Sequence, residues 1–446
     1  MVDDPIAEAR ARLSLAGPAP IAAEGRVVAA RQDLIGVRLA GLRLGDTVSI
    51  ARSGLAPLLA EVIALEEDHG LAAPLSDPRG VAREDPVSRA DDEAELAVGP
   101  SLLGRVLDGH GRARDGGPAV SGPLARVPRH RRPPDPMLRA PIARPFVTGL
   151  RLIDSCLTLG VGQRVGLFAG PGAGKSTLTG AIVRHAQFDV AVVALIGERG
   201  REVRSFLDDT LGAARARAVT VVATSDEPAA MRVRAAHTAL SVAEHFRDQG
   251  RHVLLVFDSL TRVARAQREL GLAAGEAVTR RGFPPSVFGL LPRLIERCGM
   301  SAEGAITAVM TVLVEGPTLD DPIAEEALSV LDGHLVLRGE LLTRGQSPPV
   351  DVVASVSRTM PQVTAEAQRD DAATLKRWLA AHEERRDLIA LGAYARGSDP
   401  TTDAALARWP LIESFLRQGM HRPDPFDESL AALAAVVRPG RREGPP

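Results

Sequence analysis

The sequence predicts an α/β fold: a central domain with a mostly parallel sheet, preceded by a small β-barrel and followed by a helical domain. Between residues 145 and 362, near-continuous apolar runs alternate with segments of helical spacing, which is typical of α/β domains. Earlier runs are short and interrupted by glycine, proline and aspartate, and the last part of the chain has helical spacing throughout. We expect five segments: a helical segment 1–18, a β-barrel 19–98, an α/β domain with its preceding connector 99–362, a helical domain 363–437 and a disordered tail 438–446.

Length and composition narrow the classes of protein to consider. The 446 residues are enough for two or three domains, and 45% hydrophobic with 25% charged residues is ordinary for a soluble globular protein. A net charge of −2 argues against nucleic-acid binding by bulk charge. No apolar run approaches the roughly 18 residues that cross a bilayer, and the acidic start lacks a signal-peptide pattern, so we expect a cytoplasmic protein. Cys156 and Cys298 have no metal-site spacing and are expected to be buried thiols.

In chain order, the barrel is predicted from the short runs GRVVAAR, LIGVRLAG, DTVSIAR and LLAEVIALE. The turn-rich segment 100–136 predicts a connector, whose basic run 129–132 favours a solvated linker over a phosphate or RNA contact. The apolar runs of the central domain predict buried parallel strands, and the segment between the second and third of them has helical spacing and stops at Gly250. These strands are expected at 190–197, 218–224, 252–258 and 305–314.

The segment FAGPGAGKST matches the P-loop pattern, with alanine in place of the usual first glycine. Every other basic residue except Lys376 is arginine, so Lys175 is conspicuous; its compact charge suits a tight loop around a phosphate better than a planar guanidinium would. Three glycines allow backbone N–H groups to turn towards phosphate oxygens, whereas Pro171 has no N–H to donate. The expected phosphate-binding residues are Gly170, Pro171, Gly172, Ala173, Gly174, Lys175, Ser176 and Thr177. The Ser176 hydroxyl would also bind Mg²⁺.

Hydrolysis needs further groups, and the ends of three other apolar runs supply candidates. Asp258 ends a strand as a Walker B carboxylate does, and is expected to help hold Mg²⁺. Glu198 follows another strand and could orient the attacking water, although a charged loop residue is an ordinary alternative. Arg358 follows a third strand and could be an arginine finger, although its residue type and position alone favour a structural salt bridge. Arg199 shares the loop with Glu198 and is a further candidate for nucleotide contact.

From about residue 100 to 420 the chain resembles the catalytic subunits of the rotary ATP synthase group. It is most similar to the protein-export ATPases of type III secretion systems and the flagellum. Matching segments include LLGRVLDGHGR, IGERGREVRSFL, DSLTRVARAQRELGLAAGE, TRRGFPPSVFGLLPRLIERCG and PPVDVVASVSR. The resemblance implies an N-terminal β-barrel, a RecA-like P-loop nucleotide domain and a C-terminal helical domain, assembled as a ring of six. It also implies that Glu198 is the catalytic glutamate and Arg358 the arginine finger.

Two positions depart from the family pattern. The loop reads Pro171-Gly172-Ala173-Gly174 where the family usually has Ser-Gly-Val-Gly, and it still supplies turns and donors. The family commonly has an aromatic residue, which stacks on adenine, where this chain has Ser347. Stacking on a base contributes roughly 1–3 kcal/mol, so we expect weak selectivity for ATP over GTP.

The resemblance leaves several functions open: an injectisome or flagellar export ATPase, an ATP synthase β-like subunit, a Rho-like RNA translocase, or an inactive α-like subunit. Glu198 and Arg358 in one chain argue against the inactive subunit and favour a homo-oligomer over a synthase, which divides these residues between two subunits. The absence of Phe, Tyr and Trp before residue 100 argues against an RNA-binding barrel. The segments RAQRELGLAAGE and RRGFPPSVF resemble injectisome ATPases more than flagellar ones. We therefore expect an ATP- and Mg²⁺-dependent injectisome ATPase that releases chaperones from export substrates and unfolds them, with a flagellar export ATPase as the alternative.

The expected partners follow from the same resemblance. They are five further copies of the chain in a homohexamer, a stator or regulator bound through residues 1–18, a central stalk protein, and chaperone–substrate complexes bound through the C-terminal domain. No nucleic acid is expected among them. The expected location is the cytoplasmic side of the inner membrane, peripheral to the export gate.

Overall fold

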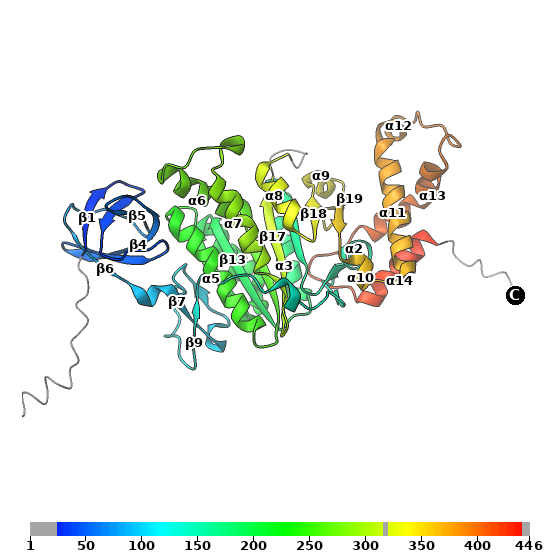
Figure 1. The fold of residues 1–446 in the computed structure, drawn as a ribbon. Coiled ribbons are helices and arrows are strands. Elements are labelled where there is room, and N and C mark those ends of the chain that lie inside the picture. Colours follow the sequence, from blue (N-terminus) through cyan, green and yellow to red (C-terminus); the bar gives the residue numbers. More distant parts are fainter. Residues whose placement is uncertain (1–24, 315–319, 439–446) are drawn as a thin grey trace, which may run out of the picture. The chain divides into compact units, whose positions relative to one another are not determined.

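The computed structural model describes residues 25–314 and 320–438 of the chain (Figure 1). The chain divides into two compact units, residues 1–94 and 95–446. The helix expected at 1–18 and nearly all of the tail expected at 438–446 lie outside the described residues. Within the described residues, no helix combines the length and the apolar character needed to span a membrane.

The first unit contains a closed barrel of six strands, in the order β1-β2-β5-β4-β3-β6. Alternation explains the barrel: Val48 and Ile50 of β3 are fully buried, while Ser49 between them is half-buried. Valine, isoleucine and leucine side chains fill the interior. The strands are β1 (Gly25–Ala30), β2 (Ile35–Arg38), β3 (Thr47–Arg52), β4 (Leu55–Leu65), β5 (Gly70–Pro74) and β6 (Pro86–Arg89).

The second unit is built on a nine-stranded sheet, in which the strand order is β19-β18-β12-β17-β15-β13-β14-β8 and β16 pairs with β17. The central strands run parallel and are buried along almost their whole length, as the continuous apolar runs predict. The edge strand β19 is antiparallel to β18. The strands are β8 (Val106–Leu107), β12 (Arg164–Ala169), β13 (Val190–Glu198), β14 (Ala218–Thr224), β15 (His252–Asp258), β16 (Gly299–Met300), β17 (Ala305–Leu313), β18 (Gly333–Leu337) and β19 (Val350–Ser357).

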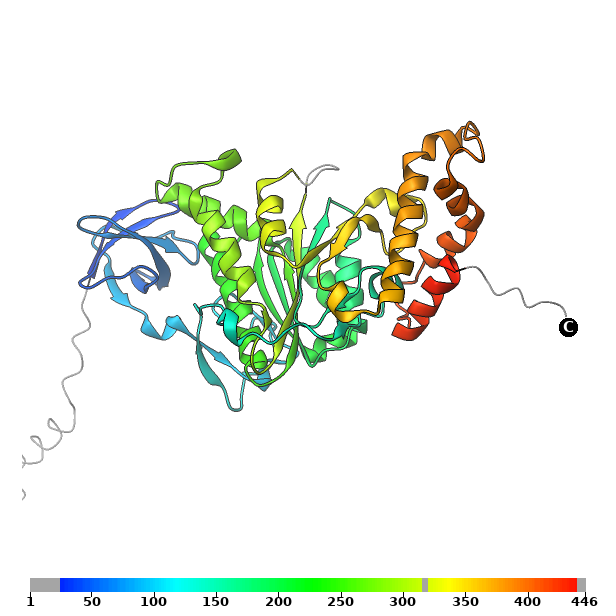
Figure 2. The ribbon, with the colours of Figure 1, turned by 45° about the vertical axis from the view of Figure 1, so that its right-hand side comes forward.

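Helices pack around this sheet, and a separate helical bundle follows it. Helix α5 contacts β13, β14 and β15, and α6 contacts β17. Figure 2 shows the C-terminal helices, coloured orange to red, gathered into one bundle. The helices of the sheet region are α2 (Arg151–Cys156), α3 (Lys175–His185), α4 (Gly200–Ser205), α5 (Ala229–Arg247), α6 (Leu260–Ala273), α7 (Pro285–Glu296), α8 (Pro322–Val330) and α9 (Gly339–Thr343). Those that follow are α10 (Met360–Val363), α11 (Glu366–Glu384), α12 (Arg386–Ala390), α13 (Pro400–Phe415) and α14 (Phe426–Val437).

The predicted fold class is therefore confirmed: a barrel, an α/β domain with a mostly parallel sheet, and a helical bundle. The four predicted central strands are present as β13, β14, β15 and β17, and the predicted helix between β14 and β15 is α5. Both cysteines are buried, and burial raises the pKa of each thiol to about 12.

The interpretation of the basic run 129–132 as a solvated linker is wrong for Arg129 and Arg131, whereas His130 and Arg132 are exposed. Arg129 is 1% exposed and donates to the Gly109 carbonyl at 3.0 Å and to the Thr238 hydroxyl at 2.5 Å. Arg131 forms an ion pair with Asp248 at 2.8 Å. The run follows β9 (Ala125–Pro128), which pairs with β7 (Glu95–Val98). It packs on α5 because Thr238 and Glu244 of that helix contact its guanidinium groups.

A buried ion pair fixes α5 to the end of α7. Arg297 donates through Nε and Nη2 to the two carboxylate oxygens of Glu244, each at 2.8 Å. Both side chains are at most 2% exposed. Because water does not reach them, each charge depends on the other for compensation.

We predict that Glu244→Gln lowers the free energy of unfolding by about 3–5 kcal/mol, because it leaves the Arg297 guanidinium buried without a counter-charge. Urea unfolding measures the change, and Glu384→Gln, at an exposed glutamate, is the matched control. The double variant Glu244→Met/Arg297→Met should recover most of the loss, because it removes both charges. A loss below about 1 kcal/mol for Glu244→Gln would contradict this account.

Candidate active site

The P-loop connects the end of β12 to the start of α3. Gly172 and Gly174 have φ values of +72° and +83°, which non-glycine residues rarely adopt, so the loop can be this tight only with glycine at both positions. No side chain caps the N-terminus of α3 among the described residues. Its first backbone N–H groups are therefore available to an anion.

Lys175 lies between two buried carboxylates. Its Nζ is 2.6 Å from Asp258 Oδ1 and 3.1 Å from Glu198 Oε1. Glu198 ends β13 and Asp258 ends β15, and these neighbouring parallel strands carry both residues to the same edge of the sheet as the P-loop. The hydroxyl of Thr311, on β17 between β12 and β15, donates to Asp258 Oδ1 at 2.6 Å. The structure thus brings together three residues that are far apart in the sequence.

Arg262 on α6 also holds Glu198, and sequence reasoning missed it. Its Nη2 is 3.1 Å from Glu198 Oε2, and its Nη1 donates to the Gly197 carbonyl. A Cβ on Gly197 would lie 2.9 Å from Arg262 Cδ, so glycine gives the guanidinium room to approach. The Ser259 hydroxyl accepts from the Arg262 N–H at 3.3 Å and starts α6. Its position in the first turn of the helix directly after Asp258 was the sequence signal that could have placed Arg262 at this site.

The loop after Glu198 adds charge to the same site. Arg199 is exposed, and its Nη1 lies 3.3 Å from Glu202 Oε1. The Glu202 carboxylate compensates part of the positive charge in the loop.

These side chains line a cavity of about 910 Å³, which is within the usual range for small-molecule sites. Its wall contains more basic than acidic side chains, which favours a polyanionic ligand. The Ser176 hydroxyl lines the cavity, and one hydroxyl with one carboxylate is a donor set that suits Mg²⁺ bound together with phosphate. The predicted residues that line it are Gly170, Pro171, Gly172, Ala173, Gly174, Lys175, Ser176, Thr177, Glu198, Arg199 and Asp258.

Arg358 lies at the opposite end of the strands from the P-loop. Leu337 of β18 pairs with Ala169 beside the P-loop, whereas Gly333 at the other end of β18 pairs with Ser357. Because β19 is antiparallel, Arg358 is displaced from the P-loop along the sheet by about the length of the five-residue strand β18, roughly 15 Å. Its side chain is exposed and donates a weak hydrogen bond to the Leu328 carbonyl at 3.4 Å.

Ser347 lies on the loop that follows α9 and passes the P-loop. A Cβ on Gly174 would be 3.4 Å from Pro349 Cγ, which places this loop directly against the phosphate-binding turn. The Ser347 carbonyl accepts from the Gln418 N–H at 2.7 Å. The position of the expected adenine-stacking residue is thus next to the P-loop, but Ser347 has no ring to offer.

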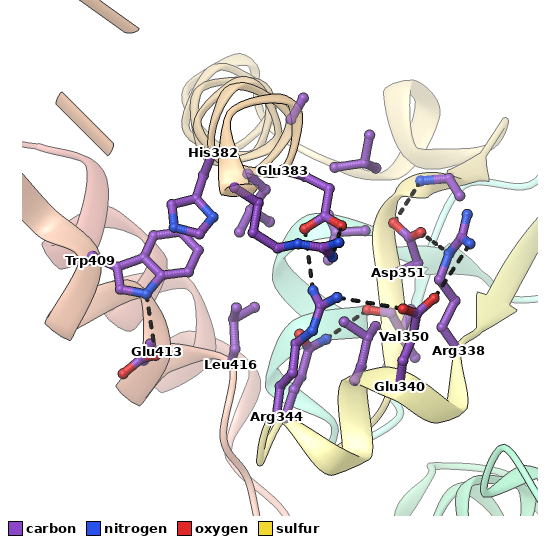
Figure 3. Close-up of a pocket in the computed structure, with 18 of the residues that line it drawn as sticks. Arg338, Glu340, Arg344, Val350, Asp351, His382, Glu383, Trp409, Glu413 and Leu416 are labelled. Carbon is purple, nitrogen blue, oxygen red and sulfur yellow. Dashed lines mark hydrogen bonds and ion pairs between the residues drawn. The ribbon is translucent and has the colours of Figure 1, made fainter. Parts of the chain in front are cut away.

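A second cavity of about 670 Å³ lies between the α9–β19 region and helices α11 and α13 (Figure 3). Its charged groups are largely paired with one another: Arg344 lies 3.2 Å from Glu383 across the cavity. The His382 ring stacks on Trp409 at a centroid distance of 3.5 Å, and the Trp409 indole donates to Glu413. None of the predicted site residues is among the described residues that line it.

Comparison with known proteins gives a consistent result along the chain. Residues 149–357 match the model of the ATP synthase alpha/beta family, nucleotide-binding domain, and residues 364–435 match the T3SS EscN ATPase C-terminal domain. A type 3 secretion system ATPase of Xanthomonas euvesicatoria is 45% identical over 98% of this chain and 99% of its own length. A flagellum-specific ATP synthase of Bacillus subtilis (strain 168) is 44% identical over 88% of this chain and 90% of its own length.

A solved structure gives the same result for the fold. The assembled ATPase EscN of the enteropathogenic E. coli type III secretion system is 42% identical, with a TM-score of 0.86, over 93% of this chain and 100% of that one. The chain therefore belongs to the ATP synthase alpha/beta family, in the group of the type 3 secretion system ATPases and flagellum-specific ATP synthases.

Proposed function

We propose that this protein is the ATPase of a type III secretion system of the injectisome kind, which releases chaperones from export substrates and unfolds the substrates at the cytoplasmic face of the export gate. The observation that carries the chemistry is the convergence of Lys175, Glu198 and Asp258 at one wall of the P-loop cavity. As a member of its family, the chain is a nucleotide-binding ATP hydrolase.

Each group at this wall has a part in phosphoryl transfer. The loop 170–174 and the start of α3 bind the phosphates through backbone N–H groups, and Lys175 adds a point charge. Ser176 and Asp258 would hold Mg²⁺, which neutralises negative charge on the phosphates. Glu198 accepts a hydrogen bond from the attacking water and orients it. Arg199 contributes positive charge at the mouth of the cavity.

The contacts of Lys175 indicate how the site changes when a nucleotide binds. In the structure the Lys175 ammonium is shared between Asp258 and Glu198. A phosphate in the loop competes for that ammonium, because it carries more charge than either carboxylate. Glu198 is then left with Arg262 as its partner, which keeps the carboxylate oriented while one of its oxygens becomes free for water.

We predict that Glu198→Gln lowers kcat by a factor of about 100 or more, because the amide orients and polarises water poorly, while nucleotide affinity is retained. Phosphate release at saturating ATP, together with binding of a fluorescent nucleotide, separates the two effects. Glu413→Gln, which changes a carboxylate at the second cavity, is the matched control and should leave kcat unchanged. Normal turnover by Glu198→Gln, or complete loss of nucleotide binding, would refute the role.

The position of Arg358 supports its action on a neighbouring copy. It is about one strand length from its own P-loop, so it cannot stabilise the phosphate bound there. In a homohexamer each chain would supply Arg358 to the next chain and receive one in return. The related EscN is known in an assembled form, and also in complex with its central stalk EscO, which supports a ring around a stalk for this chain too.

We predict that Lys175→Ala and Arg358→Ala are each inactive alone but recover part of the activity when mixed. In mixed rings some interfaces combine an intact P-loop with an intact finger, whose contribution to rate is about 10³–10⁵. ATP hydrolysis by the mixture is measured against each variant at the same total concentration, with ring formation checked by mass photometry. A fully active Arg358→Ala would remove the finger assignment. An inactive mixture of confirmed mixed rings would mean either that Arg358 acts within its own chain or that hydrolysis needs every site in the ring to work in turn.

We also predict that Ser347→Tyr lowers KM for ATP by roughly 5- to 150-fold with little change in kcat, because it restores a ring that can stack on the base. Ser347→Leu adds bulk without an aromatic face and is the matched control. Wild-type protein should hydrolyse GTP nearly as well as ATP. An equal change in KM for Leu and Tyr would mean that stacking is not the cause.

The remaining partners complete the proposal. Residues 1–18 bind a stator or regulator, the C-terminal helices receive chaperone–substrate complexes, and the ring sits at the inner-membrane export gate without nucleic acid. The flagellar alternative is supported by relatives at 44% and 43% identity in Bacillus subtilis and Pseudomonas aeruginosa. Deleting the gene distinguishes the two: loss of injectisome secretion with intact motility supports our proposal, and loss of motility supports the flagellar one. An ATP synthase β-like role is less compatible with the C-terminal domain match.

A further inference from the structure

A rigid apolar turn stands out on the surface of the α/β unit. Met137 and Leu138, on the short helix η3 (Pro136–Leu138), are 89% and 66% exposed. Prolines at 133, 134 and 136 restrict the backbone ahead of them. A backbone held in this way loses little conformational freedom when a partner covers the two large apolar side chains, which lowers the entropic cost of binding.

Hydrogen bonds on both sides fix this turn. The Asp135 carboxylate accepts from the Met137 N–H at 2.8 Å, and the Asp135 carbonyl accepts from the Leu138 N–H at 3.0 Å. On the other side Arg139 donates to the Cys298 carbonyl at 2.7 Å and lies 3.2 Å from the Glu296 carboxylate. The exposure of Met137 and Leu138 is therefore imposed by the fold around them.

A chain of ion pairs continues from this turn to Arg358. Glu296, which contacts Arg139, also pairs with Arg164 at 2.6 Å. Arg164 pairs in turn with Asp332 at 2.9 Å, and the Asp332 carbonyl accepts the backbone N–H of Arg358 at 3.0 Å. The turn and the arginine thus lie at the same edge of the sheet and are connected through fixed side chains.

A second connection runs along the backbone after the turn. A Cβ on Gly160 would clash with Ile142 Cγ2 and lie 3.3 Å from Thr359 Oγ1. Ile142 follows the turn by four residues, and Thr359 directly follows Arg358, so Gly160 is in close contact with both segments. This glycine allows the segment after the turn to pack against the segment that carries Arg358.

We propose that Met137 and Leu138, together with Arg358, form one docking face for a second copy of this chain. The inference rests on the proposed function, because that function requires Arg358 to enter the P-loop cavity of a neighbouring copy. The contact between the two copies is head-to-tail. The turn and Arg358 of one copy lie at one end of its strands, and the P-loop cavity of the other copy lies at the opposite end of its strands. Apolar contact at the turn supplies affinity, and the ion pairs, together with the hydrogen bond to the Asp332 carbonyl, fix the backbone at Arg358 relative to that contact.

The test uses the full chain with Met137→Asp/Leu138→Asp. We expect the protein concentration for half-maximal specific ATPase activity, and that for half-maximal assembly by mass photometry, to rise by about tenfold or more. Leu391→Asp changes another strongly exposed leucine, 80% exposed on the C-terminal helical part, and should leave both concentrations unchanged. Thermal unfolding and nucleotide binding of dilute protein verify that the double variant is folded. Met137→Leu/Leu138→Met keeps the apolar surface and should assemble as the wild type does.

The outcomes separate this inference from the function on which it rests. If wild-type activity is independent of protein concentration and no assembly forms, the trans role of Arg358 fails and the docking face with it. If the wild type assembles and the folded double-aspartate variant assembles at the same concentration, the docking face is wrong while the proposed function stands. If Leu391→Asp weakens assembly as strongly, the effect is general to surface apolar residues and the assignment of the turn is overturned.

Discussion

The pairing of the Lys175 ammonium with two buried carboxylates determines how the candidate active site is arranged. Glu198 and Asp258 are 6% and 3% exposed, so each needs a positive partner. Lys175 supplies it, and it can do so only because the P-loop and two other strands end at the same edge of a parallel sheet. The strand order therefore has a chemical consequence: it places the P-loop beside the two carboxylates that we propose hold the metal and orient water.

The same requirement distinguishes Lys175 from the arginines that pair with carboxylates elsewhere in the chain. Where a buried or half-buried carboxylate needs a fixed structural partner, the chain uses arginine with two parallel hydrogen bonds, as in Arg297 with Glu244 and Arg164 with Asp332. Such a pair is difficult to exchange because its geometry is specific to the carboxylate. A lysine ammonium has no preferred plane, so Lys175 can transfer its contacts from carboxylates to phosphate without rebuilding the site.

Sequence reasoning predicted the parts of the site that depend on local pattern. Glycine spacing indicated the loop before Lys175, and the ends of buried runs indicated Asp258 and Glu198. It missed Arg262, because a basic residue in a first helical turn looks like an ordinary exposed residue until the Glu198 carboxylate is placed next to it. It misjudged Arg129 for the same reason: hydrophobicity predicts solvent exposure for a charged run, and only the tertiary fold provides the acceptors on α5.

Besides tertiary contacts, the sequence pattern does not contain the direction of a strand. In this protein, the direction of β19 matters more than the missed contacts of Arg262 and Arg129. An apolar run reads the same whether its strand is parallel or antiparallel, yet the direction of β19 decides which edge of the sheet carries Arg358. A parallel β19 would have ended near the P-loop of its own chain. The antiparallel strand instead separates the arginine from the lysine by about one strand length, so a single chain contains every group of the proposed site but cannot assemble them around one phosphate. Pairing copies head-to-tail resolves this, because it joins the Arg358 edge of one chain to the cavity edge of the next.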